Sequence, residues 1–366
     1  MNSKSEMTWI DSAKGIAIIG MLVYHTGALS LPSYLGAFGS VDGWPQIFLI
    51  ISGYLTFLSL EHLVKKAGTL DFKTCVNWFL KKIIRLMPLY YLVLIIMIVC
   101  FGGISVYLGR ESELAIGNVI THFLFLFGLF PSYADNILGT EWYIGVLVIF
   151  YVLSPILYKF INSLERALFF FVGGSFLTTM FNKYIAEQLY PVDLNPGIYR
   201  SYINSYSIVA RLPALLMGIV LFFLVPYIKE CKVQGKRMIY FSCIFVVAIL
   251  ISGMAVGQNA IAGASNIVLY TVIFAIMIIA MCLDNCVLLD NRFLQSFGKY
   301  SYGIYMIHYI FILLYGKIPP VFASNYITYW LVEFIGVSVI SYILARVSDK
   351  YFEKPVCGFI IRKLGL

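Results

Sequence analysis

Long apolar runs recur along the whole chain and leave little room for a separate soluble domain. Many of these runs approach the roughly 20 residues that a helix needs to cross the hydrocarbon core of a membrane. They lie near residues 15–31, 44–61, 86–106, 117–131, 142–158, 167–182, 207–228, 238–256, 265–283, 302–316 and 326–346. The pattern predicts an all-α membrane protein in which residues 1–366 form a single domain embedded in the lipid bilayer.

The composition supports this class and narrows the chemistry. Hydrophobic residues make up 61% of the chain and charged residues 12%, against about 45–50% and 25% in an ordinary soluble domain. The seven cysteines show no metal-ligand spacing, so we expect structural cysteines and no metal site. No small-residue cleavage site follows the first apolar run, so we expect a retained membrane anchor rather than a removed signal.

The positive charges predict the topology. We attribute the net charge of +8 to basic loops on the cytoplasmic side of the membrane and not to a nucleic-acid partner. If every apolar run crossed the membrane, the basic cluster from Lys229 to Arg237 would face outward, against the positive-inside rule. The weakest run, 117–131, is therefore predicted to be re-entrant or interfacial. The result is about ten transmembrane helices with the N-terminus and the C-terminus cytoplasmic, and 21 of the 26 basic residues inside.

Ionisable residues within membrane segments are costly and mark function by default. His25 lies 11 residues after Lys14, which is about three turns and about 16 Å of helix, so both side chains can face one side. That arrangement suits a long substrate with an anionic head at Lys14 and a reactive end at His25. The alternative is a lysine that reaches the membrane surface and a histidine that bonds a neighbouring helix.

Four further residues are candidates for the same chemistry. Arg85 lies beside the membrane, where its planar guanidinium is suited to a phosphate, and Lys82 precedes it by three residues. His308 lies about two turns into a late apolar segment. Glu141 opens the segment that begins EWYIG, on the predicted outer side.

Other polar and aromatic residues carry weaker signals. His62 follows Glu61 at a predicted helix end and His122 lies in the short run 117–131, so we interpret both histidines as structural. The predicted outer loop near 183–206 is rich in tyrosine. Tyrosines beside polar groups suit sugar binding, but they are also common where a helix meets the membrane surface.

Six motifs in register resemble the acyltransferase-3 family of bacterial and animal membrane acyltransferases. They are WIDSAKGIAIIGMLVYH (9–25), IFLIISGYL (47–55), RLMPLYYL (85–92), EWYIGVLVIFYVLSPIL (141–157), ARLPALLMGIVL (210–221) and SYGIYMIH (301–308). The resemblance implies ten spans in a bacterial plasma membrane. It also implies transfer of an acyl group, usually acetyl, from cytoplasmic acyl-coenzyme A to an acceptor outside, often a carbohydrate hydroxyl.

The resemblance also suggests residue roles. It places His25 at the catalytic histidine position, and Lys14 and Arg85 at basic positions associated with acetyl-coenzyme A. We add Lys82 and His308 to the predicted donor-binding residues and Glu141 to the predicted catalytic ones.

Three positions depart from the family pattern. Lys14 replaces a more usual arginine, which removes a bidentate fork. Gln46 stands where many members have an acidic residue, and Leu147 where many carbohydrate-modifying members have glutamate. The departure at Leu147 leaves the acceptor class less well defined than the reaction.

The predicted mechanism uses neutral His25 as a general base for an acceptor hydroxyl, with an acyl-histidine intermediate as the alternative. Two other classes compete with this function. A transporter or flippase for a glycan or a lipid-linked sugar would also place charges in a helical bundle, and a scaffold would keep the fold without the reaction. We expect no appended extracellular transferase domain within the 366 residues.

Overall fold

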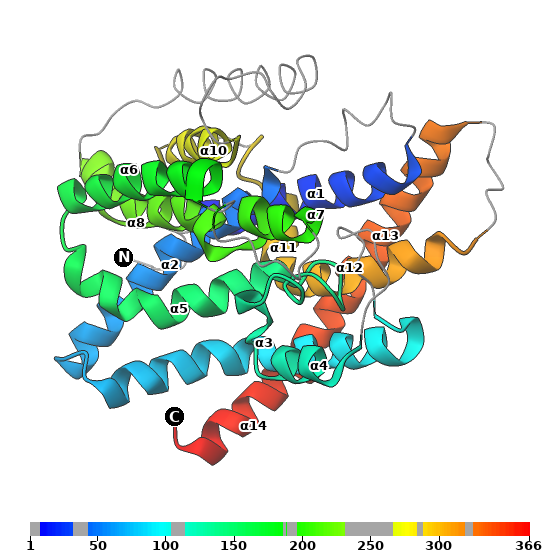
Figure 1. Ribbon diagram of the computed structural model, residues 1–366, viewed down its shortest axis with the longest axis horizontal. Coiled ribbons are helices and arrows are strands. Elements are labelled where there is room, and N and C mark those ends of the chain that lie inside the picture. The colour runs from blue at the N-terminus through cyan, green and yellow to red at the C-terminus, as the bar shows by residue number, and fades with distance from the viewer. Residues whose placement is uncertain are drawn as a thin grey trace. The chain divides into compact units, whose positions relative to one another are not determined.

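A computed structural model describes residues 8–31, 43–103, 114–185, 188, 196–230, 266–283, 288–318 and 325–366. Every regular element in these ranges is a helix (Figure 1), which confirms the all-α prediction. The chain divides into two compact units. One comprises Met1–Ile51 with Phe223–Val347, and the other Ser52–Phe222 with Ser348–Leu366.

The first unit brings the start of the chain together with its last third. It contains α1 (Thr8–Ser30), the beginning of α2 (Trp44–Ala67), α10 (Asn266–Leu283), α11 (Arg292–Lys299), α12 (Ser301–Tyr315) and α13 (Tyr326–Ser348). Helix α1 packs against α10, α11 and α12. Its long hydrophobic sequence allows burial on several sides, as expected of a helix inside a bundle.

Glycines set the closest approaches in this unit. A Cβ atom at Gly15 of α1 would overlap the backbone of Leu294 in α11, and one at Gly298 would overlap the carbonyl of Asp11. The backbones of α1 and α11 therefore touch directly. Gly303 plays a similar part between α12 and α13, since a Cβ there would lie 2.7 Å from the Cβ of Ala345.

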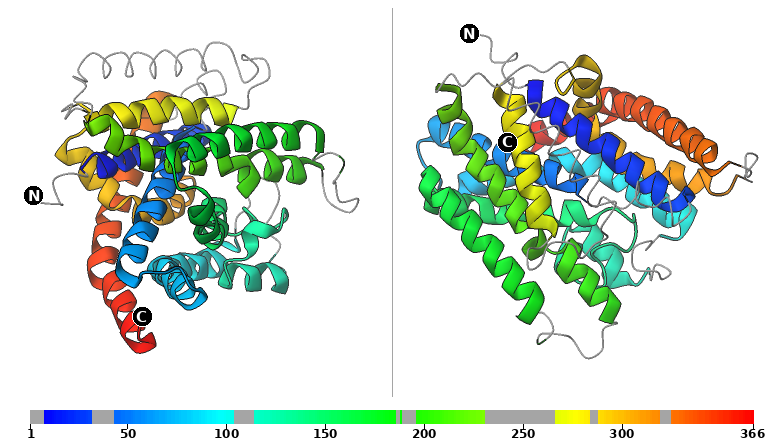
Figure 2. Two further views of the ribbon diagram at one scale, coloured as in Figure 1. Left: turned by 90° about the vertical axis from the view of Figure 1, so that its left-hand side faces the viewer. Right: turned by 90° about the horizontal axis from the view of Figure 1, so that it is seen from above.

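The second unit is built on the middle of the chain and its C-terminal helix. Its elements are the rest of α2, α3 (Phe72–Phe101), α4 (Ile116–Phe123), the 3-10 turn η1 (Phe127–Leu129), α5 (Trp142–Phe160), α6 (Leu164–Met180), the π-helical turns η2 (Phe181–Ile185), η3 (Tyr202–Tyr206) and η4 (Asp349–Glu353), α7 (Pro196–Ser201), the part of α8 (Ile208–Glu230) up to Phe222, and α14 (Lys354–Leu364). Helix α3 packs against both α5 and α14. Helices α6 and α8 lie side by side (Figure 2), and Thr178 of α6 donates a hydrogen bond to the carbonyl of Val209 in α8 at 2.8 Å.

Apart from 117–131, the predicted apolar segments on described residues coincide with helices, but some boundaries differ. Helix α3 begins at Phe72, well before the predicted start at 86, because Asp71 caps it by accepting from the N–H of Thr74 at 2.7 Å. The basic residues Lys82 and Arg85 therefore lie within this helix and not ahead of it. The predicted segment 238–256 lies outside the described residues, as does the basic stretch that follows Glu230.

The weak segment 117–131 does not form one long helix. Helix α4 has 8 residues, about 12 Å of length, which is too short to cross a hydrocarbon core of about 30 Å. The chain then turns at Phe125, whose φ of 56° lies in the left-handed region. This geometry fits the predicted re-entrant or interfacial segment, although its place in a membrane stays a prediction.

Five described helices are long and apolar enough to cross a membrane: Trp44–Ala67, Phe72–Phe101, Trp142–Phe160, Ile198–Ile228 and Tyr326–Leu364. Two shorter apolar helices cover Ile267–Cys282 and Ser301–Tyr315. The described part of the chain thus has the character of a membrane protein. The count of ten spans and the cytoplasmic placement of both termini stay predictions.

Candidate functional site

Two histidines from opposite ends of the sequence meet in the first unit. Nδ1 of His25 on α1 lies 2.8 Å from Nε2 of His308 on α12. The two rings are nearly parallel, with an angle of 9° between their planes and 5.0 Å between their centroids. The His308 side chain is fully buried, and His25 retains 7% exposure. A direct ring-to-ring hydrogen bond therefore joins the two helices.

Aromatic residues enclose this histidine pair. Tyr309 stands edge-on to both rings, with centroids 5.9 Å from His25 and 5.8 Å from His308. Tyr24 lies beside His25, at 5.3 Å between centroids. These contacts restrict ring rotation and give the pair an apolar surrounding, in which a polar interaction is stronger than it would be in water.

Helix α13 holds the end of α1 through two polar contacts. The indole N–H of Trp330 donates to Oγ1 of Thr26 at 3.0 Å. One turn further along α1, Ser30 donates to the carboxylate of Glu333, which is 2% exposed. These contacts fix the part of α1 that carries His25.

Lys14 lies on the same continuous helix as His25, as predicted. Its ammonium forms an ion pair with Asp11, one turn earlier, with 3.3 Å between Nζ and Oδ1. An anionic ligand at Lys14 would share this ammonium with the Asp11 carboxylate. The contact would be that of a point charge, because a lysine ammonium lacks the planar fork of arginine.

The other predicted basic residues belong to α3 in the second unit. The ammonium of Lys82 lies 5.3 Å from the ring centroid of Trp78 and 5.8 Å from that of Tyr151 on α5, so it makes cation–π contacts. Arg85 is exposed. It interacts electrostatically with Tyr151 and with Glu353. The guanidinium is therefore open to a ligand and also has neighbours within the protein.

Glu141 is fully buried at the start of α5. Its Oε1 accepts the N–H groups of Asn136 at 2.7 Å and of Ile137 at 2.6 Å, and its Oε2 accepts that of Thr140 at 3.0 Å. Nε2 of His122 lies 3.2 Å from Oε1. The carboxylate thereby closes the loop that precedes α5, and these contacts favour a role in holding the loop.

Both ring nitrogens of His122 have hydrogen-bond partners. Its Nδ1 faces the carbonyl of Asn118 at 2.9 Å and its Nε2 faces Glu141. The ring therefore links the end of α4 to the carboxyl group of Glu141. Burial would raise the pKa of Glu141, but the hydrogen bond and charge of His122 outweigh it and lower that pKa. Burial and the neighbouring Glu141 raise the pKa of Asp135 well above its usual range.

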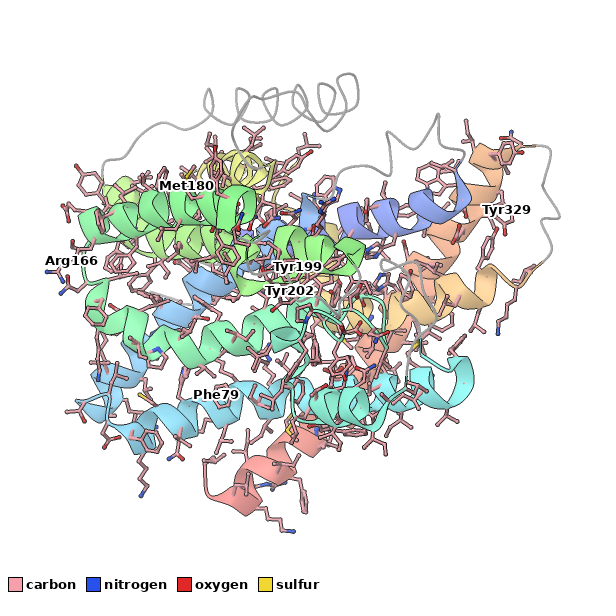
Figure 3. The ribbon with its side chains drawn as sticks, viewed as in Figure 1. Phe79, Arg166, Met180, Tyr199, Tyr202 and Tyr329 are labelled. Atoms are coloured by element: carbon pink, nitrogen blue, oxygen red, sulfur yellow. The ribbon has the colours of Figure 1, made fainter. Side chains whose placement is uncertain are left out.

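The described residues of the tyrosine-rich region near 183–206 are mostly helical. Tyr199 and Tyr202, labelled in Figure 3, lie on α7 and η3 and pack around Ile203. The Tyr202 hydroxyl donates to the carbonyl of Gly128 at 2.8 Å. These two tyrosines serve internal packing of the second unit, whereas Tyr184 is 55% exposed.

Comparison with known proteins decides the family. Residues 7–346 match the family described as the acyltransferase domain, named acyltransferase-3. The chain belongs to the acyltransferase-3 family. The predicted family resemblance is therefore confirmed over nearly the whole sequence.

Two relatives are named as O-acetyltransferases. A peptidoglycan O-acetyltransferase, OatA, of Listeria monocytogenes is 24% identical over 98% of this chain and 57% of the relative. The O-acetyltransferase OatA of Staphylococcus aureus is 25% identical over 97% of this chain and 58% of the relative. The chain thus spans a little over half the length of these curated relatives. No solved structure matches it significantly.

The sequence pointed to both histidines of the buried pair. It assigned them separate roles, with His25 as a catalytic residue and His308 as a donor-binding residue. It also interpreted His122 as merely structural, without its bond to Glu141, and did not single out Trp330 or Glu333. Glu333 could have been noticed from the sequence, because it is an acidic residue within an apolar segment. Among the described residues, no group of three or more His, Cys, Asp or Glu is placed to hold a metal ion.

Proposed function

We propose that this chain is a membrane O-acetyltransferase that moves an acetyl group from cytoplasmic acetyl-coenzyme A to a hydroxyl on the opposite side of the membrane. Membership of the acyltransferase-3 family and relatives named as O-acetyltransferases support the reaction class. The observation that carries the chemistry is His25, a nearly buried histidine on the first helix whose ring is held by a second histidine. Histidine is the side chain most often used as a general base.

The proposed reaction uses His25 to remove one proton. The acceptor hydroxyl gives its proton to neutral His25 while its oxygen attacks the thioester carbonyl. A carbon–oxygen bond forms and the carbon–sulfur bond breaks. The departing coenzyme A thiolate then takes the proton from His25, which restores the neutral base. A positioned base of this kind contributes about 10²–10⁴-fold to the rate.

Coenzyme A is polyanionic, so its phosphates need basic side chains at the cytoplasmic side. We assign this role to Arg85, whose exposed guanidinium can form paired hydrogen bonds with a phosphate. Lys82, on the same helix, supplies further positive charge, and Lys14 on α1 stays a predicted donor contact. Only the thin thioester arm of the donor then has to enter the apolar part of the protein.

The acceptor is proposed from the relatives' names. Because a relative is named a peptidoglycan O-acetyltransferase, we propose a bacterial cell-surface carbohydrate as acceptor and the bacterial plasma membrane as location. Delivery of the acetyl group through another protein is a second route to the same acceptor.

Radiolabelled transfer tests the function. The purified chain, reconstituted in lipid vesicles, is incubated with acetyl-labelled acetyl-coenzyme A and with peptidoglycan fragments or other surface glycans. We expect alkali-labile label on a glycan, or hydrolysis of the thioester when the acceptor or partner is missing. Glycan movement across the vesicle membrane without any loss of thioester would instead establish the transporter alternative.

Removing the Arg85 guanidinium should weaken donor binding. Since a hydrogen bond to a charged group contributes about 1.5–3 kcal/mol, Arg85→Ala should raise the dissociation constant for acetyl-coenzyme A roughly 10-fold to 100-fold. Equilibrium binding of labelled donor to the purified protein measures this change. Lys81→Ala, an exposed basic residue on the same helix, is the matched control, and equal affinity of the two variants would remove Arg85 from the donor site.

A further inference from the structure

The hydrogen bonds around His308 have a defined direction. Its Nδ1 lies 2.7 Å from the carbonyl oxygen of Tyr305, one turn earlier on α12. A carbonyl oxygen only accepts hydrogen bonds, so Nδ1 of His308 must carry the proton and donate it. In a neutral imidazole the other nitrogen then has the lone pair. Nε2 of His308 is therefore an acceptor.

The acceptor role of His308 also determines which nitrogen of His25 carries the proton. Because Nε2 of His308 accepts, Nδ1 of His25, at 2.8 Å, must be the donor. The 5.0 Å between centroids exceeds the N···N distance by about two ring radii, and the ring planes differ by only 9°. The two rings thus lie edge to edge and nearly coplanar, which is the geometry of an in-plane hydrogen bond and not of a face-to-face stack.

We propose that His308 is a positioning residue that fixes the tautomer of His25: it holds the proton on Nδ1 of His25 and so makes Nε2 the basic nitrogen. The proposal rests on the proposed function, in which His25 is the base. It replaces the sequence-based prediction that His308 contacts the acyl donor.

Burial supports this division of roles. His308 is fully buried, whereas His25 keeps 7% exposure, so of the two residues only His25 retains any exposed surface. The surrounding structure also fixes His308 firmly. Gly303, on the same helix, lets α12 approach α13 closely, and Tyr309 stands edge-on to both histidine rings. A ring held in this way can orient its neighbour without touching the substrate.

The tautomer matters because only one ring nitrogen of a neutral histidine can take a proton. Which nitrogen that is depends on the hydrogen bond made by the other. When the imidazole of a catalytic histidine is held in the wrong tautomer, the rate falls by about 10⁴-fold in a serine protease. His308 occupies the corresponding place here, with a neutral imidazole in place of a carboxylate.

Paired substitutions at His308 test the role kinetically. His308→Phe keeps a flat ring but removes the acceptor, and should lower kcat by roughly 10²–10⁴-fold with little change in KM for acetyl-coenzyme A. His308→Gln offers an amide oxygen to Nδ1 of His25 and should restore most of kcat. If both variants instead raise KM for the donor and retain kcat, His308 binds the donor and the proposal is wrong.

Nitrogen NMR tests the tautomer independently of activity. The chain has four histidines, so ¹⁵N-histidine labelling of the protein in lipid gives few signals, and the His25→Gln variant assigns those of His25. We expect a protonated Nδ1 and an unprotonated Nε2 in the wild-type protein, and loss of this preference in His308→Phe. A wild-type His25 protonated on Nε2 would overturn the proposal even if the enzyme is active. The expected tautomer in a protein without acetyl transfer would overturn only the proposed function.

Discussion

Replacement of His25 by alanine should abolish acetyl transfer while the protein still inserts into the membrane and binds acetyl-coenzyme A. The substitution removes the proposed base, and loss of a positioned base costs about 10²–10⁴-fold. It also removes the ring that bonds His308. The predicted donor-binding side chains Arg85 and Lys82 lie on α3 and are unchanged in this variant.

The His25→Ala variant is measured by initial rates of labelled acetyl transfer and, separately, by equilibrium binding of the donor. His62→Ala is the matched control, because His62 is an exposed histidine that contacts the carbonyl of Leu58 in its own helix. We expect wild-type rates from this control. A purified His25→Ala protein that transfers acetyl at the wild-type rate would remove His25 from the mechanism.

A methyl group at Gly298 should destabilise the fold. The Cβ of alanine would overlap the backbone carbonyl of Asp11, and backbone atoms cannot move aside as a flexible side chain can. Helix α11 would have to move off α1. Overpacking of this kind costs about 1–3 kcal/mol or more, so we expect Gly298→Ala to lower the yield of folded protein and its thermal unfolding temperature.

Gly336→Ala on α13 is the control for Gly298→Ala. No described atom lies within 4 Å of a Cβ placed at Gly336, and alanine favours a helix over glycine by about 0.5–1 kcal/mol. This variant should be as stable as the wild type or slightly more so. Intrinsic fluorescence during heating in detergent compares the unfolding temperatures of Gly298→Ala and Gly336→Ala. Equal temperatures would show that the backbones of α11 and α1 are not in close contact.

The length of the apolar runs predicted the long helices well, because helices of this kind can be recognised from their composition alone. It missed elements whose sequence is polar on one side. Helix α11 (Arg292–Lys299) and helix α14 (Lys354–Leu364) contain too many polar residues to form an apolar run. The polar first turns of α3 were missed for the same reason, since the cap at Asp71 and not the hydropathy sets where that helix begins.

The candidate site was predictable by residue type but not by partner. A histidine deep in an apolar segment stands out in any sequence, and both His25 and His308 do so. Their pairing joins residues 283 positions apart, which no spacing rule can foresee. Glu141 shows the opposite difficulty. Its position at a helix start suggested catalysis, whereas the four hydrogen bonds that surround it depend on the fold of the preceding loop.

If α12 crosses the membrane as predicted, its short length has a consequence for the lipid beside it. Its 15 residues cover about 22 Å, less than the hydrocarbon thickness of about 30 Å. A short apolar helix is accommodated by local thinning of the bilayer or by long flanking side chains that reach the headgroups. Thinning beside α12 would bring the ring of His25 nearer to water and shorten the path of the acetyl group. The acyl-chain length of the reconstituting lipid is therefore a variable that can tune this enzyme.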